Sequence, residues 1–220
     1  GGYGGGGGST VGTIKDKVKG NKYFYKNAGT WAADMLNAER AGLQAMHDTN
    51  TIRVPRPICG GSGAKGSYAV FEYLNMGGRG SGELMGIQLA QMHRALSPNG
   101  KYGFDMDNTI GATEQPNGWM DTWPEFFVER RLRHMLRLCE NQGAVFNEKE
   151  AVLEKTHKIL SAHEAAPSLL HGDLWGGNQG FLSPTGEPVI FDPATYYGDR
   201  ETDLAMTHLF GGFSQAFYDG

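Results

Sequence analysis

Two aspartates and one asparagine in the last third of the chain have the types and spacing that phosphate transfer requires. Asp173 follows an apolar run, Asn178 comes five residues later, and Asp192 follows a second apolar run at 189–190. The apolar pairs at 181–182 and 189–190 flank Ser-Pro-Thr-Gly, which predicts a hairpin that returns Asp192 beside the Asp173 loop. Three oxygen-bearing side chains would then converge. Such groups can orient a hydroxyl and hold the magnesium ions that neutralise charge on phosphates.

The spacing of these residues matches a kinase motif with two departures. The step from Asp173 to Asn178 fits the catalytic loop H-R-D-x-x-x-x-N, with Gly172 in the place of the arginine. Asp192 stands where kinases carry the metal-binding aspartate of D-F-G, but Pro and Ala follow it. These departures favour kinase-like phosphotransferases of small molecules. Each residue alone could be a turn former or a cap, and His171 is expected to shape the loop by hydrogen bonding rather than to act as a base.

A lysine and a glutamate nearer the N-terminus form a second charged pair. Strands are expected over 11–18 and 22–26, with Lys26 at the end of the second strand. A helix capped by Thr30 is predicted to follow, with an apolar stripe on which Glu39 falls. A carboxylate on such a stripe is costly unless it is paired. The sequence therefore predicts the Lys26–Glu39 pair with which kinases hold nucleotide phosphates, and the alternative is an exposed Glu39 at the margin of the stripe.

Two further segments are candidates for contact with a nucleotide. Residues 1–8 are almost all glycine, which would let backbone N–H groups close around phosphate but is also typical of a linker. The strand over 67–74 runs into Asn-Met-Gly-Gly, a change of composition that predicts a hinge between two lobes. Adenine is expected to lie against this hinge and to bind the peptide groups of Glu72, Tyr73 and Leu74.

Helices are predicted for most of the chain beyond the hinge. The apolar spacing indicates a helix over 82–96, on which His93 is a surface or packing residue. Residues 97–113 are expected to form a loop, and a further helix follows Trp123. The predicted core stripe of that helix consists of Val128, Leu132, Met135, Leu136 and Cys139. Asp203 is expected to cap a helix or to brace a loop.

Four aromatic residues lie close together, at 119, 123, 126 and 127. Aromatic residues at this density usually belong to a core, because their side chains bury a large area. Trp119 lies in a polar loop, however, and is the better candidate for contact with a substrate.

Composition excludes several other classes of protein. The 220 residues carry a formal net charge of −4 with no basic stripe, so we expect no nucleic-acid partner. Cys59 and Cys139 form neither a disulfide framework nor a zinc motif, which favours a reducing compartment. No apolar run is long enough for a membrane span, and no signal-like segment is visible. Because the chain opens on Gly1 and stops in mid-pattern at Gly220, we expect a fragment, cytoplasmic by default, with a plastid or other organelle as the alternative.

These motifs resemble the fructosamine-3-kinase and ketosamine-3-kinase family over nearly the whole chain. The segments that carry the resemblance are YFYK at 23–26, RVPRP at 53–57, VFEYL at 70–74, GFDMDNTIGAT at 103–113, WMDTWPEFFVERRL at 119–132, LLHGDLWGGN at 169–178, FDPATYYGDRETDLA at 191–205 and GGFSQAFY at 211–218. The resemblance implies an α+β fold with two kinase-like lobes. A small β-rich nucleotide-binding lobe would span residues 1–75, and a mostly helical catalytic and substrate lobe, with its C-terminal helices truncated, would span 76–220.

The resemblance also implies an activity. Members of the family use ATP and Mg²⁺ to phosphorylate the C3 hydroxyl of ketosamines, such as ribulosamines and fructosamines, which leads to protein deglycation. The partners would be glycated proteins or small ketosamines, and the oligomeric state is left open. Two alternatives are kept: a kinase of another small amino sugar or alcohol, and a nucleotide-binding protein without turnover.

The resemblance further implies a role for each matching residue. Asp173 would orient and deprotonate the C3 hydroxyl, and Asn178 and Asp192 would bind magnesium. Lys26 would contact the phosphates, with Glu39 behind it. The remaining implied contacts are Gly6, Gly7 and Gly8 over the phosphates, and Trp175 and Trp119 beside the sugar. Ser9 stands where some relatives carry a cysteine, so redox control through this loop is not expected.

Overall fold

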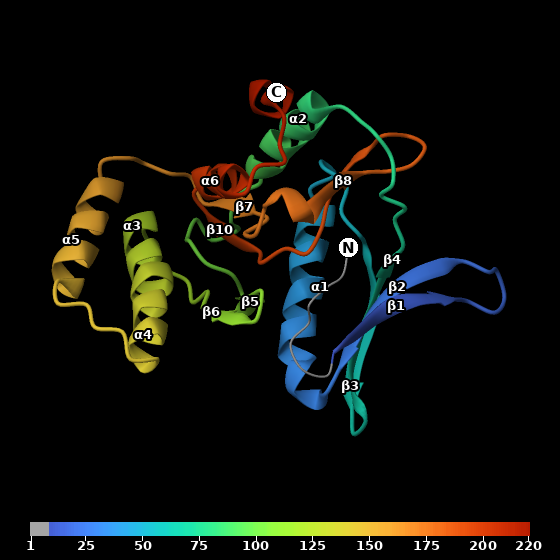
Figure 1. Ribbon diagram of the computed structural model, residues 1–220, viewed down its shortest axis with the longest axis horizontal. Coiled ribbons are helices and arrows are strands. Elements are labelled where there is room, and N and C mark those ends of the chain that lie inside the picture. Colours follow the sequence, from blue (N-terminus) through green and yellow to red (C-terminus); the bar gives the residue numbers. More distant parts are fainter. Residues whose placement is uncertain (1–8) are drawn as a thin grey trace.

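An antiparallel sheet of four strands forms the N-terminal part of the molecule. The computed structural model describes residues 9–220, and the sheet has the strand order β1-β2-β4-β3 (Figure 1). The strands are β1 (Thr10–Lys15), β2 (Lys22–Ala28), β3 (Pro57–Gly63) and β4 (Gly66–Glu72). In the register, Lys26 of β2 stands opposite Val11 of β1 and Ala69 of β4. The hairpin predicted at the start of the chain is therefore present, and Lys26 lies within β2 rather than at its end.

Helix α1 (Ala33–His47) lies against this sheet and carries Glu39 (Figure 1). Its apolar stripe is buried, and Leu36 and Met46 share a core with Phe71 of β4. The prediction that Thr30 caps this helix is wrong. A single 3-10 turn (Thr30–Ala32) precedes α1, and no side chain caps the turn or the helix. The turn supplies its own bond, from the Ala32 N–H to the Gly29 carbonyl.

Helices make up much of the chain beyond the sheet. They are α2 (Gly82–His93), α3 (Trp123–Phe126), α4 (Arg133–Asn141), α5 (Lys149–Leu160), α6 (Glu201–Leu209) and α7 (Gln215–Asp219). A π-helical segment (Phe127–Leu132) joins α3 to α4, and a 3-10 turn (Gly176–Asn178) ends the loop that carries Asp173. None of the helices within residues 9–220 combines the length and the apolar character needed to cross a membrane.

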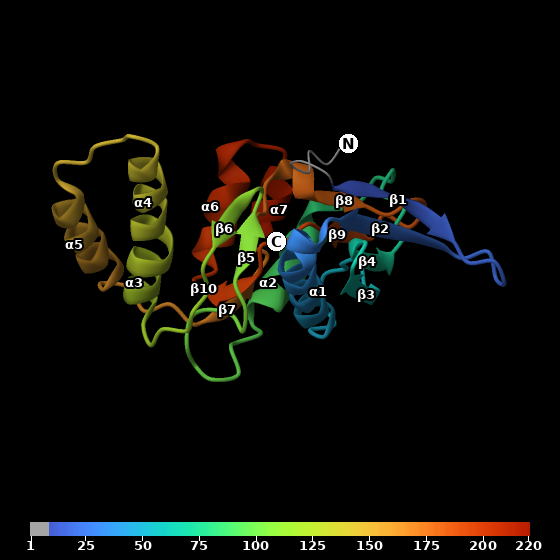
Figure 2. The same ribbon diagram turned by 90° about the horizontal axis from the view of Figure 1, so that it is seen from below.

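Helices α4 and α5 stand apart from the rest of the molecule (Figures 1 and 2). Of the five residues in the core stripe predicted for this region, only Val128 is buried, and Met135 is 45% exposed. The prediction is therefore wrong for α4, in which no residue is buried. The reason is that α5 packs mainly on α3 and the π-helical segment. The apolar spacing marks a helical face but does not say what covers it.

Three short antiparallel pairs hold the functional loops. They are β7 (Ser168–Leu170) with β10 (Tyr196–Gly198), β8 (Gln179–Phe181) with β9 (Pro188–Ile190), and β5 (Asn108–Ile110) with β6 (Thr113–Gln115). The β8–β9 pair confirms the hairpin predicted to return Asp192. Strand β5 lies within residues 97–113, for which a loop is predicted, because strands of three residues are too short to show an alternating pattern. The β5–β6 hairpin stands between α1 and α4 in both views (Figures 1 and 2).

Two hydrophobic clusters connect these elements. The larger one joins the sheet and α1 to the strands around Asp173, because Phe71 of β4 packs in the same core as Leu169 of β7 and Ile190 of β9. The smaller one forms around Trp123 and Phe126, so the core role predicted for these two aromatic residues is confirmed. The charged side chains of β2 and α1 are therefore held at a fixed position relative to the loops at 171–178 and 191–195.

Candidate active site

Three charged side chains from distant parts of the chain meet between the sheet and these loops. Lys26 Nζ lies 2.6 Å from Glu39 Oε1 and 3.4 Å from Asp192 Oδ1. The side chains of Lys26, Glu39 and Asp192 are only 15%, 15% and 17% exposed, so each carboxylate needs a nearby cation. The ion pair expected between Lys26 and Glu39 is present, and the alternative of an exposed Glu39 is wrong. Contact of Lys26 with phosphates stays a prediction.

Asp192 has a strained backbone and a perturbed carboxyl group. Its φ of 56° lies in the left-handed region, which costs an L-residue about 1–2 kcal/mol. Hydrogen bonds hold the chain on both sides, from the Phe191 N–H to the Asn178 carbonyl at 3.1 Å and from the Ala194 N–H to the His171 carbonyl at 2.9 Å. Burial raises the pKa of Asp192 to about 7.

Asp173 and Asn178 contact each other directly across the catalytic loop. Asn178 Nδ2 donates to the Asp173 carbonyl at 2.9 Å and to Asp173 Oδ2 at 3.3 Å. Burial raises the pKa of Asp173 to about 6, against the hydrogen bond from Asn178, which lowers it, and together with the charge of Asp203, which raises it. A carboxylate with a pKa in this range can accept a proton and is still ionised at neutral pH.

A buried carboxylate, Asp203 of α6, fixes the base of this loop. It accepts hydrogen bonds from the N–H groups of His171 and Gly172, both at 2.9 Å, and lies 2.8 Å from Nε2 of His93. Burial raises the pKa of Asp203, but His93, His171 and the Gly172 N–H together hold it below its usual value. The loop-bracing role predicted for Asp203 is confirmed. His93, expected to be a surface or packing residue, is packed in the interior as its partner.

His171 and Gly172 have structural tasks in the loop. The fully buried ring of His171 accepts the Asp173 N–H at Nδ1, and its Nε2 donates to the Phe191 carbonyl at 2.7 Å. With one ring nitrogen accepting and the other donating, His171 is a neutral imidazole. Burial lowers the pKa of His171, which also favours the neutral form. Gly172 has a φ of +86°, and a Cβ there would lie 1.9 Å from the Ala194 carbonyl oxygen. The close approach explains why glycine replaces the arginine of the kinase motif.

The donor set at this point suits a hard divalent cation. Asp192 offers a carboxylate, and Asn178 offers Oδ1, because its Nδ2 is bonded to Asp173. In the described part of the chain, no group of three or more His, Cys, Asp or Glu residues could hold a metal alone. Mg²⁺ commonly takes one or two protein ligands and completes its shell with phosphate oxygens and water. Two oxygen ligands therefore fit Mg²⁺ bound together with a nucleotide.

The two tryptophans predicted to border the sugar lie in different aromatic groups. Trp175 is 41% exposed, and its backbone N–H donates to the Asp173 carbonyl at 3.1 Å. Its ring packs edge-to-face with that of Phe210, with 6.1 Å between ring centres. Trp119 stacks on Tyr197 with 6.0 Å between ring centres. Trp175 is thus part of the catalytic loop itself. Substrate contact by either ring stays a prediction.

The nucleotide contacts predicted at the hinge, at Glu72, Tyr73 and Leu74, stay a prediction. The Glu72 N–H donates to the Arg56 carbonyl at 2.9 Å, so it is already occupied. Tyr73 and Leu74 lie just beyond the end of β4, and the amino group of Lys22 lies 4.1 Å from the centre of the Tyr73 ring. The predicted phosphate contacts Gly6, Gly7 and Gly8 lie outside the described residues.

Sequence reasoning missed two groups of residues around the site. Arg53 joins Glu72 to the β8–β9 hairpin through ion pairs. Asn108 and Gln115 of the β5–β6 hairpin donate to the backbone beyond Asp192. The RVPRP motif gave a signal for Arg53. The two amides lie in a polar segment whose pattern does not distinguish buried from exposed residues.

These features define a class of protein: a phosphotransferase of the protein-kinase-like fold. A solved aminoglycoside-3'-phosphotransferase of type VIII shares this fold, with a TM-score of 0.55 at 17% identity over 97% of this chain and 85% of that one. The crystal structure of a protein assigned to the fructosamine-3-kinases, from Haemophilus somnus 129PT, has a TM-score of 0.86 at 32% identity and covers 96% of this chain and 70% of that one.

The chain belongs to the fructosamine kinase family, whose model matches residues 5–220. A probable ketoamine kinase of Synechocystis sp. is 50% identical over 202 residues, which are 90% of this chain and 68% of the relative. The chloroplastic protein-ribulosamine 3-kinase of Oryza sativa subsp. japonica is 40% identical over 208 residues, which are 92% of this chain and 60% of the relative. The chain thus spans 60–68% of the length of these two relatives.

Proposed function

We propose that the protein transfers a phosphoryl group from ATP to the C3 hydroxyl of a ketosamine. The observation that carries this proposal is the meeting of Lys26, Glu39 and Asp192 beside the loop that holds Asp173 and Asn178. Phosphoryl transfer needs a positioned carboxylate, ligands for a divalent cation and a lysine for the phosphates, and this arrangement supplies each of them. The names of the ketoamine and ribulosamine kinases among its relatives support the substrate class.

Each residue has a proposed task in the reaction. Asp173 orients the acceptor hydroxyl and takes its proton, which its pKa of about 6 allows at neutral pH. Asn178 Oδ1 and the Asp192 carboxylate hold Mg²⁺, which when bound neutralises charge on the phosphates. Lys26, fixed by Glu39, contacts the same phosphates. Phosphate binding by Gly6, Gly7 and Gly8 completes this proposal.

The substrate and nucleotide sites are proposed around the same arrangement. We infer that Trp175 and Trp119 border the sugar and that adenine binds the Glu72 carbonyl and the peptide groups of Tyr73 and Leu74. Residues 1–75 then form the nucleotide-binding lobe and residues 76–220 the catalytic lobe. The acceptor is a ribulosamine or fructosamine on a glycated protein or a small amine, and phosphorylation of such adducts leads to protein deglycation.

The test is phosphate transfer to a ribulosamine and a fructosamine, measured in parallel with magnesium and ATP. Turnover of either compound is expected, and Asp173→Asn should lower it by roughly 10²–10⁴-fold while ATP binding with magnesium is retained. Asp121→Asn is the matched control, because Asp121 is 77% exposed and its ion pair within residues 9–220 is with the surface residue Lys101. An unchanged rate in Asp173→Asn would remove Asp173 from its role. Turnover of another amino sugar or alcohol alone would move the proposal to that substrate.

A further inference from the structure

The segment that carries Asp192, residues 191–195, is held from two sides by hydrogen bonds. On one side it is tied to the catalytic loop, through His171 and Asn178. On the other side the β5–β6 hairpin donates two amide hydrogen bonds to it. Gln115 Nε2 reaches the Ala194 carbonyl at 3.1 Å, and Asn108 Nδ2 reaches the Thr195 carbonyl at 2.7 Å.

These two amides belong to a buried polar network. Asn108 and Gln115 face each other across the β5–β6 pair and are 7% and 4% exposed. The Oδ1 of Asn108 accepts from Gln115 Nε2 and from Asn117 Nδ2, both at 2.9 Å. A buried network whose members satisfy one another has one preferred geometry. The hydrogen bonds within the network therefore fix the direction in which the two amides donate to the segment.

The far end of the network is anchored in the aromatic core. Arg131 of the π-helical segment donates to Asn117 Oδ1 at 2.7 Å and to the Pro116 carbonyl at 2.6 Å. Its guanidinium lies over the rings of Tyr196 and Phe126, 4.1 Å and 4.8 Å from their centres. The hairpin is thus connected to the aromatic cluster on the side away from Asp192.

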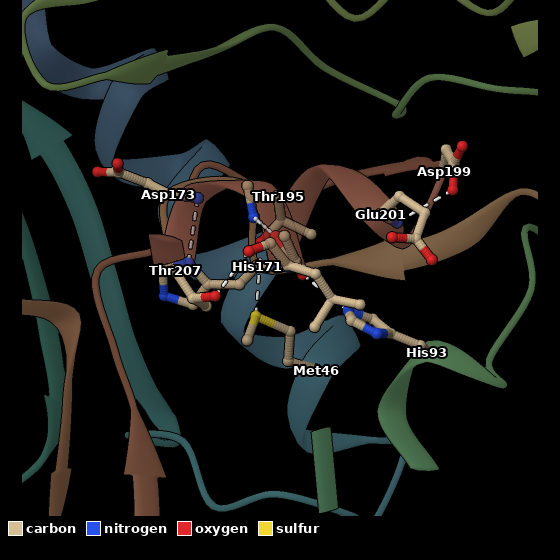
Figure 3. A network of polar contacts seen from close by, with 11 residues as sticks. Met46, His93, His171, Asp173, Thr195, Asp199, Glu201 and Thr207 are labelled. Carbon is tan, nitrogen blue, oxygen red and sulfur yellow. Dashed lines mark hydrogen bonds and ion pairs between the residues drawn. The ribbon is translucent and has the colours of Figure 1, made fainter. Parts of the chain in front are cut away.

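Helix α1 closes the remaining side of the segment. A Cβ on Gly42 would lie 2.8 Å from Thr195 Oγ1, so the helix passes close to Thr195. Thr195 Oγ1 also lies 3.5 Å from the sulfur of Met46 (Figure 3). Thr195 is therefore held between the hairpin and the helix that carries Glu39.

We propose that Asn108 and Gln115 are positioning residues for Asp192. A left-handed aspartate persists only where its surroundings hold it, and these amides secure the chain two and three residues after it. Without them the Ala194 and Thr195 carbonyls lose their buried donors and the segment can shift. The Asp192 carboxylate would then turn away from the cation that it is proposed to hold. In this respect the inference rests on the proposed function.

The experiment measures binding of Mn²⁺, a paramagnetic substitute for Mg²⁺, by electron paramagnetic resonance in the presence of a non-hydrolysable ATP analogue. Gln115→Met keeps the length of the side chain but removes both donations, and Asn108→Ser is the second variant. Each is expected to weaken Mn²⁺ affinity about tenfold, the lower end of the effect of groups that orient metal ligands. Binding of the analogue without metal should change less than about twofold. Glu114→Gln is the matched control, because Glu114 adjoins Gln115 on β6 but its side chain is exposed.

Each outcome has one meaning for the positioning role. Unchanged Mn²⁺ affinity in folded Gln115→Met and Asn108→Ser would overturn it, and so would an equal loss in Glu114→Gln or failure of both variants to fold. The expected loss supports it even if the wild-type protein phosphorylates no ketosamine, in which case the proposed substrate fails and the positioning role stands. Normal ketosamine turnover by the wild type, together with unchanged Mn²⁺ affinity in the two variants, would support the proposed function and overturn the positioning role.

Discussion

At the scale of single residues, the buried carboxyl of Asp173 sets a pH limit on the reaction. The proposed base must be ionised, and burial raises its pKa to about 6. We expect kcat/KM for the ketosamine to be constant above this pH and to fall as the pH drops below it, approaching tenfold per pH unit. Initial rates between about pH 5 and pH 8, at saturating magnesium, measure this. A profile that stays flat down to about pH 5 would contradict the assignment of Asp173.

The raised pKa of Asp192 makes the free energy of unfolding depend on pH. Its pKa of about 7 in the folded protein exceeds the ordinary value, so the unfolded chain loses this proton at lower pH than the folded protein does. The free energy of unfolding therefore falls as the pH rises from about 4 to about 7. Asp192→Asn removes the buried charge, and asparagine tolerates the left-handed backbone.

We expect Asp192→Asn to raise Tm at pH 8 by about 2–4 °C without nucleotide, the shift that corresponds to about 1 kcal/mol in a chain of this size. The gain should largely vanish near pH 4, where Asp192 of the wild type is protonated. Thermal unfolding of both proteins at the two pH values tests this. An equal gain at both pH values would trace the effect to the backbone rather than to the charge.

At the scale of elements, helices with a regular apolar spacing could be predicted from the sequence, and short elements without such a spacing could not. Glu39 was correctly paired because the stripe of α1 has a clear helical spacing. His93 also had a signal, since it lies four residues after the buried Leu89 on α2, although its partner Asp203 is far along the chain. The β5–β6 hairpin had no signal, because its short strands carry buried amides. The exposed stripe of α4 shows that spacing identifies a face without identifying its neighbour.

The catalytic loop requires glycine at 172 for two separable reasons. One is its φ of +86°, and the other is the Ala194 carbonyl oxygen 1.9 Å from the position of a Cβ. Gly100 shares the first reason only, with a φ of +71° and no atom within 4 Å of its Cβ position. We expect Gly100→Ala to cost about 1–2 kcal/mol of unfolding free energy and Gly172→Ala about 3 kcal/mol or more.

Urea unfolding of the two variants measures the difference. Gly172→Ala should also lose turnover, because the clash pushes the loop away from the Asp192 segment. Equal costs in the two variants would mean that the loop absorbs the clash and that only the backbone angle matters.

At the scale of the whole molecule, the site depends on contacts between the sheet and the part that carries the catalytic loops. The shared core around Phe71, Leu169 and Ile190 provides apolar contact between them. Arg53 provides a polar one. Its carbonyl accepts the Ile190 N–H at 3.1 Å, and its guanidinium lies 2.8 Å from Glu72 Oε2 and 3.5 Å from Glu187 Oε2. Sequence could mark the RVPRP motif, but two carboxylates so far apart in the chain become partners only in the fold.

This arrangement predicts that Arg53→Met weakens ATP binding although Arg53 itself does not contact the nucleotide. Glu72 directly precedes the proposed adenine contacts at Tyr73 and Leu74, and loss of its partner releases the end of β4. The pair is partly exposed, at 34% and 29%, so we expect about a two- to fivefold loss of ATP affinity, corresponding to up to about 1 kcal/mol, with an unchanged KM for the ketosamine. Glu187→Gln is the control, because it removes only the longer contact. Calorimetric titration with ATP compares the variants, and a less stable Arg53→Met protein with unchanged ATP affinity would limit Arg53 to holding the fold.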